Sequence, residues 1–150
     1  MKKITLILLA LTYGCSNSNT SDLPTPSKSI PLSQEFKNYW FDGTAEISSY
    51  TLNQSRYGAP RAGNAVLIYV TEDFLKETQV KADIKSEASQ MVLKLNRTKN
   101  FLTGIYPYSI MTSVFSRLGQ SRPLVKTTTS IQKWCGQAYL QLNRRKGLEI

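Results

Sequence analysis

Apolar and polar residues alternate along most of this chain with a period of two, which is the pattern of β-strands that bury one face. The clearest runs are Met91–Leu95 and the stretch from Trp134 to Asn143, where every second side chain is apolar or small. Ala65–Val70 is apolar on both faces, as in a central strand, whereas Gly43–Leu52 alternates weakly, as in an edge strand. The pattern therefore predicts a mainly β protein.

We expect a curved antiparallel sheet or half-barrel of about six strands, with one or two short helices. Further strands are predicted after Pro107 and over Leu124–Ile131. Short helices are predicted over Leu32–Tyr39 and over Asp73–Gln79, the latter with Thr71 as its N-cap. The glycines and proline of residues 56–63 predict a long hairpin loop.

The N-terminus has the order of a bacterial lipoprotein signal. Lys2 and Lys3 precede the apolar run Ile4–Leu11, and Gly14 stands just before Cys15. A run of about eight residues is too short to span a bilayer, which needs about 20. Thr12 stands where a leucine is usual, so an ordinary cleaved signal peptide is the alternative. We predict lipidation at Cys15 and a location in the cell envelope, on the outer or inner membrane and facing the periplasm.

The domain organisation follows from this signal. Residues 1–14 are interpreted as the signal peptide, 15–34 as a flexible Ser/Asn/Thr/Pro-rich tether, and 35–150 as one antiparallel β domain. The last residues are typical of a strand, a turn at Lys146-Gly147 and the start of another strand. We therefore expect the chain to be the N-terminal part of a longer protein.

The positive charge is concentrated in the last 60 residues. The chain has 19 Lys and Arg against 10 Asp and Glu, a net charge of +9, and residues 91–150 contain ten of the cations with Glu149 as their single acid. Such asymmetry is typical of a protein with an anionic partner, although a solubilising Lys-rich surface is the simpler explanation. Because no DNA- or RNA-binding motif accompanies the charge, a nucleic-acid partner is not expected.

Composition removes most catalytic chemistry. The chain has no histidine and, beyond Cys15, one cysteine, which excludes Ser/His/Asp and Cys/His arrangements and thiolate metal clusters. The carboxylates Asp42, Glu46, Glu72 and Asp73 are too scattered to assign as an acid/base pair. We assign no catalytic residue, metal or cofactor, and favour a protein that is not an enzyme.

Two segments are candidates for ligand binding. Arg56 and Arg61 flank a glycine-containing loop that could present guanidinium groups and backbone amides to an anion, although a plain loop is the alternative. Trp134 and Cys135 form an unusual pair before Gly136. We expect Cys135 to be a buried structural thiol, because the alternation places Lys133 and Cys135 on opposite strand faces.

Aromatic residues offer a further possibility. The runs Tyr39-Trp40-Phe41 and Tyr106-Pro107-Tyr108 combine large apolar rings with polar tips. Such side chains can line an apolar cavity, although they lie more often in an ordinary core.

Several motifs resemble a bacterial lipoprotein family of unsettled function. The resemblance covers nearly the whole mature chain, and its most specific parts are Gly104-Ile-Tyr-Pro-Tyr-Ser109 and Trp134-Cys-Gly136. It implies a lipid-anchored envelope protein about twice as long, often with histidine where this chain has Gln137. Members are often labelled septum formation inhibitor Maf, a label that implies a nucleotide pyrophosphatase. The early Ser-x-Ser-Pro-Arg-Arg type loop of those enzymes is absent here.

The sequence therefore supports three functions in decreasing order. The first is a membrane-anchored, non-enzymatic binding or structural domain, with an apolar or anionic ligand or an envelope protein as its partner. The second is an envelope hydrolase that needs a missing C-terminal part, and the third is the Maf-type pyrophosphatase.

Overall fold

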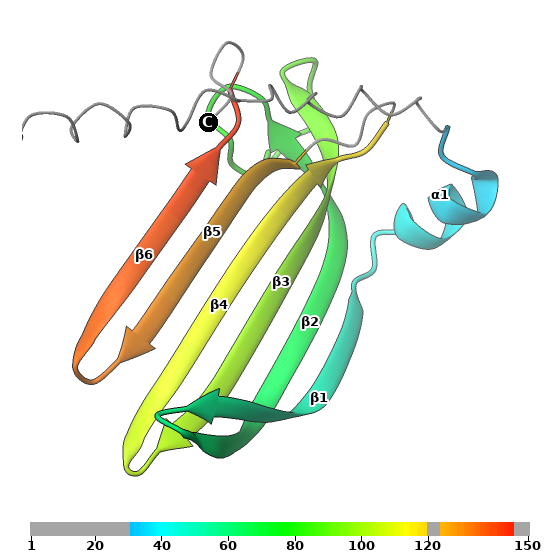
Figure 1. Cartoon of the computed structure of the whole chain (residues 1–150). Helices are drawn as coiled ribbons and strands as arrows, with labels where there is room; N and C mark the ends of the chain where they lie inside the picture. Colours follow the sequence, from blue (N-terminus) through cyan, green and yellow to red (C-terminus); the bar gives the residue numbers. More distant parts are fainter. Residues whose placement is uncertain (1–30, 120–123, 146–150) are drawn as a thin grey trace, which may run out of the picture.

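The computed structural model describes residues 31–119 and 124–145, and it confirms a mainly β fold. One helix precedes six strands that form one antiparallel sheet in sequence order, β1-β2-β3-β4-β5-β6 (Figure 1). The sheet is open, with β1 and β6 at its edges. The elements are α1 Gln34–Trp40, β1 Glu46–Arg56, β2 Ala59–Leu75, β3 Ser89–Thr103, β4 Tyr106–Arg117, β5 Leu124–Lys133 and β6 Gly136–Asn143.

The predicted N-terminal helix is confirmed as α1. Ser33 is its N-cap, and the Ser33 hydroxyl accepts a hydrogen bond from the Phe36 amide at 3.1 Å. Trp40 packs edge-on against Tyr69 of β2, with ring centroids 6.1 Å apart, and its carbonyl accepts a hydrogen bond from the Thr71 hydroxyl. These contacts hold the helix beside the sheet near β1 and β2.

The second predicted helix, over Asp73–Gln79, is wrong. β2 continues to Leu75, because Asp73 and Leu75 pair with Met91 and Ser89 of β3, and pairing along a long neighbouring strand outweighs a weak local helix preference. Thr71 is a strand residue and no N-cap.

Three hairpins place their turns at the same end of the sheet, here called the turn end. The turns are Tyr57-Gly58, Gly104-Ile105 and Trp134-Cys135. Tyr57 and Gly58 both have positive φ, 53° and 72°, as a type I′ turn requires. The long loop predicted over residues 56–63 is therefore wrong, because Pro60 and Arg61 already pair with Ser55 and Gln54.

The sheet is curved because the β1–β2 hairpin folds over one face at the turn end. Figure 1 shows this hairpin crossing in front of the ends of β3 and β4. The fold-over is held by a hydrogen bond between the Tyr57 and Tyr108 hydroxyls at 3.0 Å and by one from Lys99 Nζ to Gln54 Oε1 at 3.2 Å. The face that the hairpin covers is called the concave face below, and the opposite face the convex face.

Directly paired residues share a face, so the strand register assigns each side chain to one side. The concave face carries aliphatic or aromatic side chains from every strand, crossed by one polar row of Arg97, Thr112 and Thr129. Its apolar members are Leu52, Leu67, Tyr69, Leu93, Leu95, Phe101, Tyr108, Ile110, Val114, Ile131, Ala138, Leu140 and Leu142.

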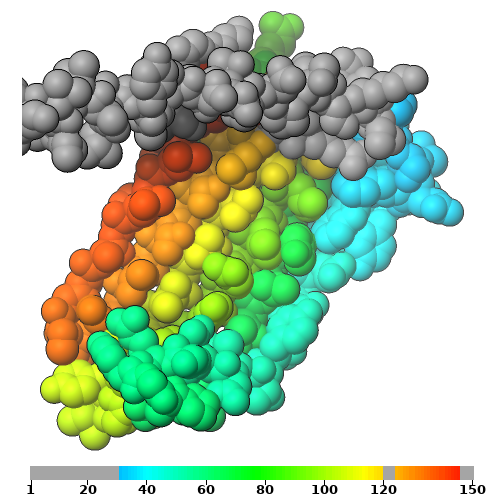
Figure 2. Space-filling model, viewed as in Figure 1, coloured from blue at the N-terminus to red at the C-terminus, as the bar shows by residue number. Residues whose placement is uncertain are grey.

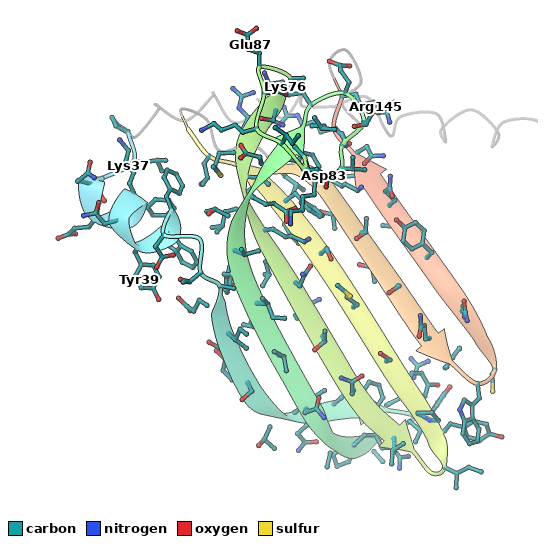
Figure 3. All side chains as sticks on the ribbon, turned by 180° about the vertical axis from the view of Figure 1, so that it is seen from behind. Lys37, Tyr39, Lys76, Asp83, Glu87 and Arg145 are labelled. Atoms are coloured by element: carbon teal, nitrogen blue, oxygen red, sulfur yellow. The ribbon has the colours of Figure 1, made fainter. Side chains whose placement is uncertain are left out.

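The buried core lies at the other end of the sheet. Phe74, Val92, Phe115 and Val125 form one buried cluster, with the rings of Phe74 and Phe115 5.1 Å apart. Seen from behind, the β2–β3 connection that carries Lys76, Asp83 and Glu87 lies over the ends of the strands (Figure 3). Its Ala82 is buried, and the Ala82 amide donates to the Asp73 carbonyl at 2.8 Å.

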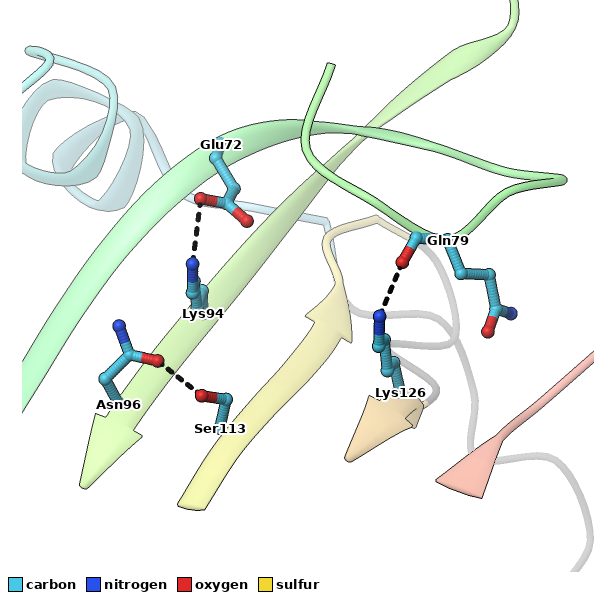
Figure 4. A network of polar contacts seen from close by, with 6 residues as sticks. All are labelled: Glu72, Gln79, Lys94, Asn96, Ser113 and Lys126. Atoms are coloured by element: carbon cyan, nitrogen blue, oxygen red, sulfur yellow. Dashed lines mark hydrogen bonds and ion pairs between the residues drawn. The ribbon is translucent and has the colours of Figure 1, made fainter. Parts of the chain in front are cut away.

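Polar contacts dominate the convex face beside this core. Lys94 pairs with Glu72 at 3.4 Å, Ser113 donates to Asn96 at 2.7 Å, and Lys126 donates to the Gln79 carbonyl at 2.8 Å (Figure 4). These bonds tie β2 to β3, β3 to β4, and β5 to the connection above them.

Several predictions concern residues outside the described ranges. They are the signal peptide, Cys15 and its lipidation, most of the tether over 15–34, and the turn at Lys146-Gly147. No helix within residues 31–119 and 124–145 is both long and apolar enough to span a bilayer.

Candidate ligand cleft at the turn end of the concave face

A cleft of about 400 Å³ opens at the turn end, where the folded β1–β2 hairpin faces the other two hairpins. Strand residues of the concave face form most of its wall, and turn residues complete it. The lining residues are Tyr57, Arg61, Thr103, Gly104, Tyr106, Tyr108, Lys133 and Cys135. The cleft is therefore the continuation of the concave face beneath the hairpin.

The sheet register explains why these residues meet. Phe101, Tyr108 and Lys133 stand side by side on β3, β4 and β5, each paired to the next. The rings of Phe101 and Tyr108 are stacked, with centroids 4.9 Å apart. Arg61 reaches the same place from β2 only because the hairpin folds over.

The electrostatic character of the cleft is positive. Arg61 and Lys133 line it, no acidic side chain is among its lining residues, and Arg56 lies beside it. The Arg61 Nε is buried without a hydrogen-bond partner among the described residues. A buried donor of this kind is costly unless an acceptor satisfies it.

Arg56 and Tyr108 influence each other. The Arg56 guanidinium lies over the Tyr57 and Tyr108 rings, 4.7 Å and 5.5 Å from their centroids. The pKa of Tyr108 is lowered from its ordinary value, chiefly by the hydrogen bond from Tyr57 and then by Arg56 and Lys133. The surroundings of this hydroxyl therefore favour negative charge.

The four residues predicted for ligand binding come together at this end of the sheet. Arg61 and Cys135 line the cleft, and Arg56 adjoins it. Trp134 packs edge-on against the cleft residue Tyr106, with ring centroids 5.6 Å apart, and is 66% exposed. The sequence placed these residues in two separate candidate sites.

The prediction that Cys135 is buried is wrong. Cys135 is exposed and lies in the β5–β6 turn, so the alternation of strand faces does not extend to it. For the same reason Lys133 and Cys135 line the same cleft and do not face apart.

Sequence reasoning missed Tyr57, Thr103 and Lys133 as parts of this site. Tyr106 and Tyr108 had been candidates for a cavity wall, and both line the cleft. The other aromatic run, Tyr39-Trp40-Phe41, lies at the end of α1 and packs near β1 and β2. No local motif distinguishes Tyr57 or Lys133, because their role depends on the folding of the hairpin.

The candidate carboxylates have structural partners. Glu46 accepts a hydrogen bond from the Tyr39 hydroxyl at 2.9 Å, and Glu72 pairs with Lys94. The amide and hydroxyl of Thr44 lower the pKa of Asp42 by hydrogen bonding to its carboxylate. Glu72 and Asp73 are neighbours in β2 and lie on opposite faces. The described ranges hold no group of three His, Cys, Asp or Glu side chains that could bind a metal ion.

Comparison of the chain with protein-family models, with curated proteins and with solved structures finds no match. The resemblance to the lipoprotein family therefore rests on the sequence motifs alone.

Proposed function

We propose that this protein is a membrane-anchored envelope lipoprotein whose concave face binds the acyl chain of a lipid-like ligand. The observation that carries the proposal is the openness of the concave face. Its aliphatic side chains on β2 to β5, such as Leu67, Leu95 and Ile131, are only partly buried, and Leu140 on β6 is 61% exposed. Figure 2 shows these strands uncovered beside the folded hairpin.

The distribution of apolar groups supports binding in preference to simple core formation. The buried cluster lies beneath the β2–β3 connection at the far end of the sheet, whereas the concave face presents a separate apolar surface. Large exposed apolar surfaces are typical of interaction sites. From Tyr108 to Val114 this surface extends over six residues of β4, or about 20 Å at about 3.3 Å per residue. A trough of that length suits an extended acyl chain, which gains about 0.8 kcal/mol for each CH₂ it buries.

The binding test uses a matched pair of double variants in β6. Leu140→Glu with Leu142→Glu places two charges on the concave face, and Tyr139→Glu with Gln141→Glu places the same charges on the convex face. Leu140 and Tyr139 are similarly exposed, at 61% and 66%, so both variants are expected to fold. We expect the concave variant to lose about tenfold or more in affinity for a neutral monoacylglycerol, because a carboxylate must be desolvated beside the chain.

Affinity is measured by displacement of an uncharged apolar fluorophore, with circular dichroism as the check on folding. The convex variant should bind like the wild type. Equal losses in both variants, or a wild type that binds no monoacylglycerol, would contradict acyl-chain binding on the concave face.

The anchor is tested separately through the two cysteines. Cys15→Ser should release the protein from the membrane fraction, because lipidation at Cys15 would supply the two or more acyl chains that stable anchoring requires. Cys135→Ser is the control and should stay in the membrane fraction. If the wild type and Cys15→Ser are both recovered as soluble cleaved protein, the N-terminal segment is an ordinary signal peptide.

A further inference from the structure

The cleft and the apolar trough are parts of one continuous surface. Tyr108 and Lys133 line the cleft, and two residues further along the same strands Ile110 and Ile131 form a directly paired row of the trough. A ligand that occupies the cleft would therefore meet the trough without crossing a strand. The two parts differ in character, since the trough is aliphatic and the cleft has cations and tyrosine hydroxyls.

The cations at the cleft have no acidic partner within the described part of the chain. The ion pair found there joins Lys94 and Glu72 on the convex face, so it involves neither Arg61 nor Lys133. The buried Arg61 Nε lacks an acceptor, and the Tyr57 and Tyr108 hydroxyls lie 3.0 Å apart at the same cleft. This set of donors matches the oxygen atoms of a carboxylate or phosphate group.

We propose that the cleft binds the anionic head group of a single-chain amphiphile, such as a fatty acid or a lysophospholipid, whose chain lies along the concave face. The proposal rests on the proposed function, because it requires acyl-chain binding in the trough. It adds the charge of the ligand and its direction, with the head group at the turn end and the chain running toward the end that carries the β2–β3 connection.

The experiment compares two ligands with the same chain, palmitate and monopalmitoylglycerol, at pH 8 and low ionic strength. The full chain is expected to bind palmitate about tenfold or more tightly, because charge-assisted hydrogen bonds are lost with the neutral ligand. Added salt should reduce this preference. Arg61→Gln combined with Lys133→Gln should bring the ratio of the two affinities close to one and leave monopalmitoylglycerol binding unchanged.

Two controls locate the effect. Lys85→Gln combined with Arg117→Gln removes the same net charge from exposed positions outside the cleft, and it should keep the preference for palmitate. Arg97→Gln removes an exposed cation from the polar row of the concave face, and it should also keep the preference. Loss of the preference in either control would place the anion elsewhere and overturn the proposal.

The remaining outcomes separate the two proposals. Equal binding of palmitate and monopalmitoylglycerol by the wild type would overturn the head-group site and leave acyl-chain binding intact. Binding of neither ligand would overturn both proposals. If inorganic phosphate or butyrate alone competes as well as palmitate, the cleft is an anion site independent of the trough, and the proposed orientation of an amphiphile is wrong.

Discussion

Phe74→Ala is expected to lower the free energy of unfolding by about 3–5 kcal/mol, the range for truncating a buried aromatic side chain. Phe74 is 1% exposed and Val92 beside it is fully buried. The Phe115 ring, which Phe74 contacts, also lies beneath Lys94 and Lys126, 5.2 Å and 5.8 Å from its centroid. The cavity would therefore open within the cluster that holds the β2–β3 connection on the sheet. Equilibrium urea unfolding measures the loss.

Leu102→Ala is the control, because Leu102 is a large aliphatic residue of β3 that is 56% exposed. Its loss should stay below about 1 kcal/mol. A Phe74→Ala variant as stable as Leu102→Ala would show that the cluster contributes little to the stability of the fold.

The sheet could be predicted because its evidence is local. In Gly136–Asn143 alternate residues lie on alternate faces, and this pattern identified β6 and its apolar side correctly. The cap at Ser33 likewise belongs to the few residues that form α1. Signals of this kind do not depend on how distant parts of the chain meet.

The errors arose where distant pairing decides the local structure. Asp73–Gln79 resembles a helix in isolation, but β3 supplies a partner for β2 as far as Leu75. Trp134 and Cys135 continue the alternation of the following strand, yet they form its turn, because Lys133 already pairs with Gly136. Register between strands decides both cases, and a single sequence does not contain it explicitly.

The cleft could not be predicted as a unit for the same reason. Arg61 and Lys133 belong to strands that do not pair with each other, and they line one cleft only because the β1–β2 hairpin folds across the sheet. The position that permits this folding is Gly63. It lacks a side chain on the concave face, where it is directly paired with Leu52 of β1 and Phe101 of β3.

Gly63→Ala is therefore expected to destabilise the protein by about 3 kcal/mol and to open the cleft. A methyl group at this position would clash with the Asn100 carbonyl oxygen and would lie 2.8 Å from the Phe101 Cβ. Because the oxygen belongs to the backbone, it moves only if the pairing of β2 with β3 moves, and overpacking of this kind typically costs about 1–3 kcal/mol or more. Urea unfolding measures the stability, and hydrogen exchange across residues 55–63 reports whether the hairpin has separated from the sheet.

Ala62→Ser is the matched control, since the neighbouring position is exposed on the convex face and should tolerate the added oxygen within about 0.5 kcal/mol. If the hairpin is displaced in Gly63→Ala, Arg61 leaves the cleft while Lys133 stays, and the preference for an anionic over a neutral ligand should fall together with the stability. A Gly63→Ala protein with wild-type stability and unchanged exchange would show that β2 does not approach β3 this closely, and that the hairpin is held over the concave face by other contacts.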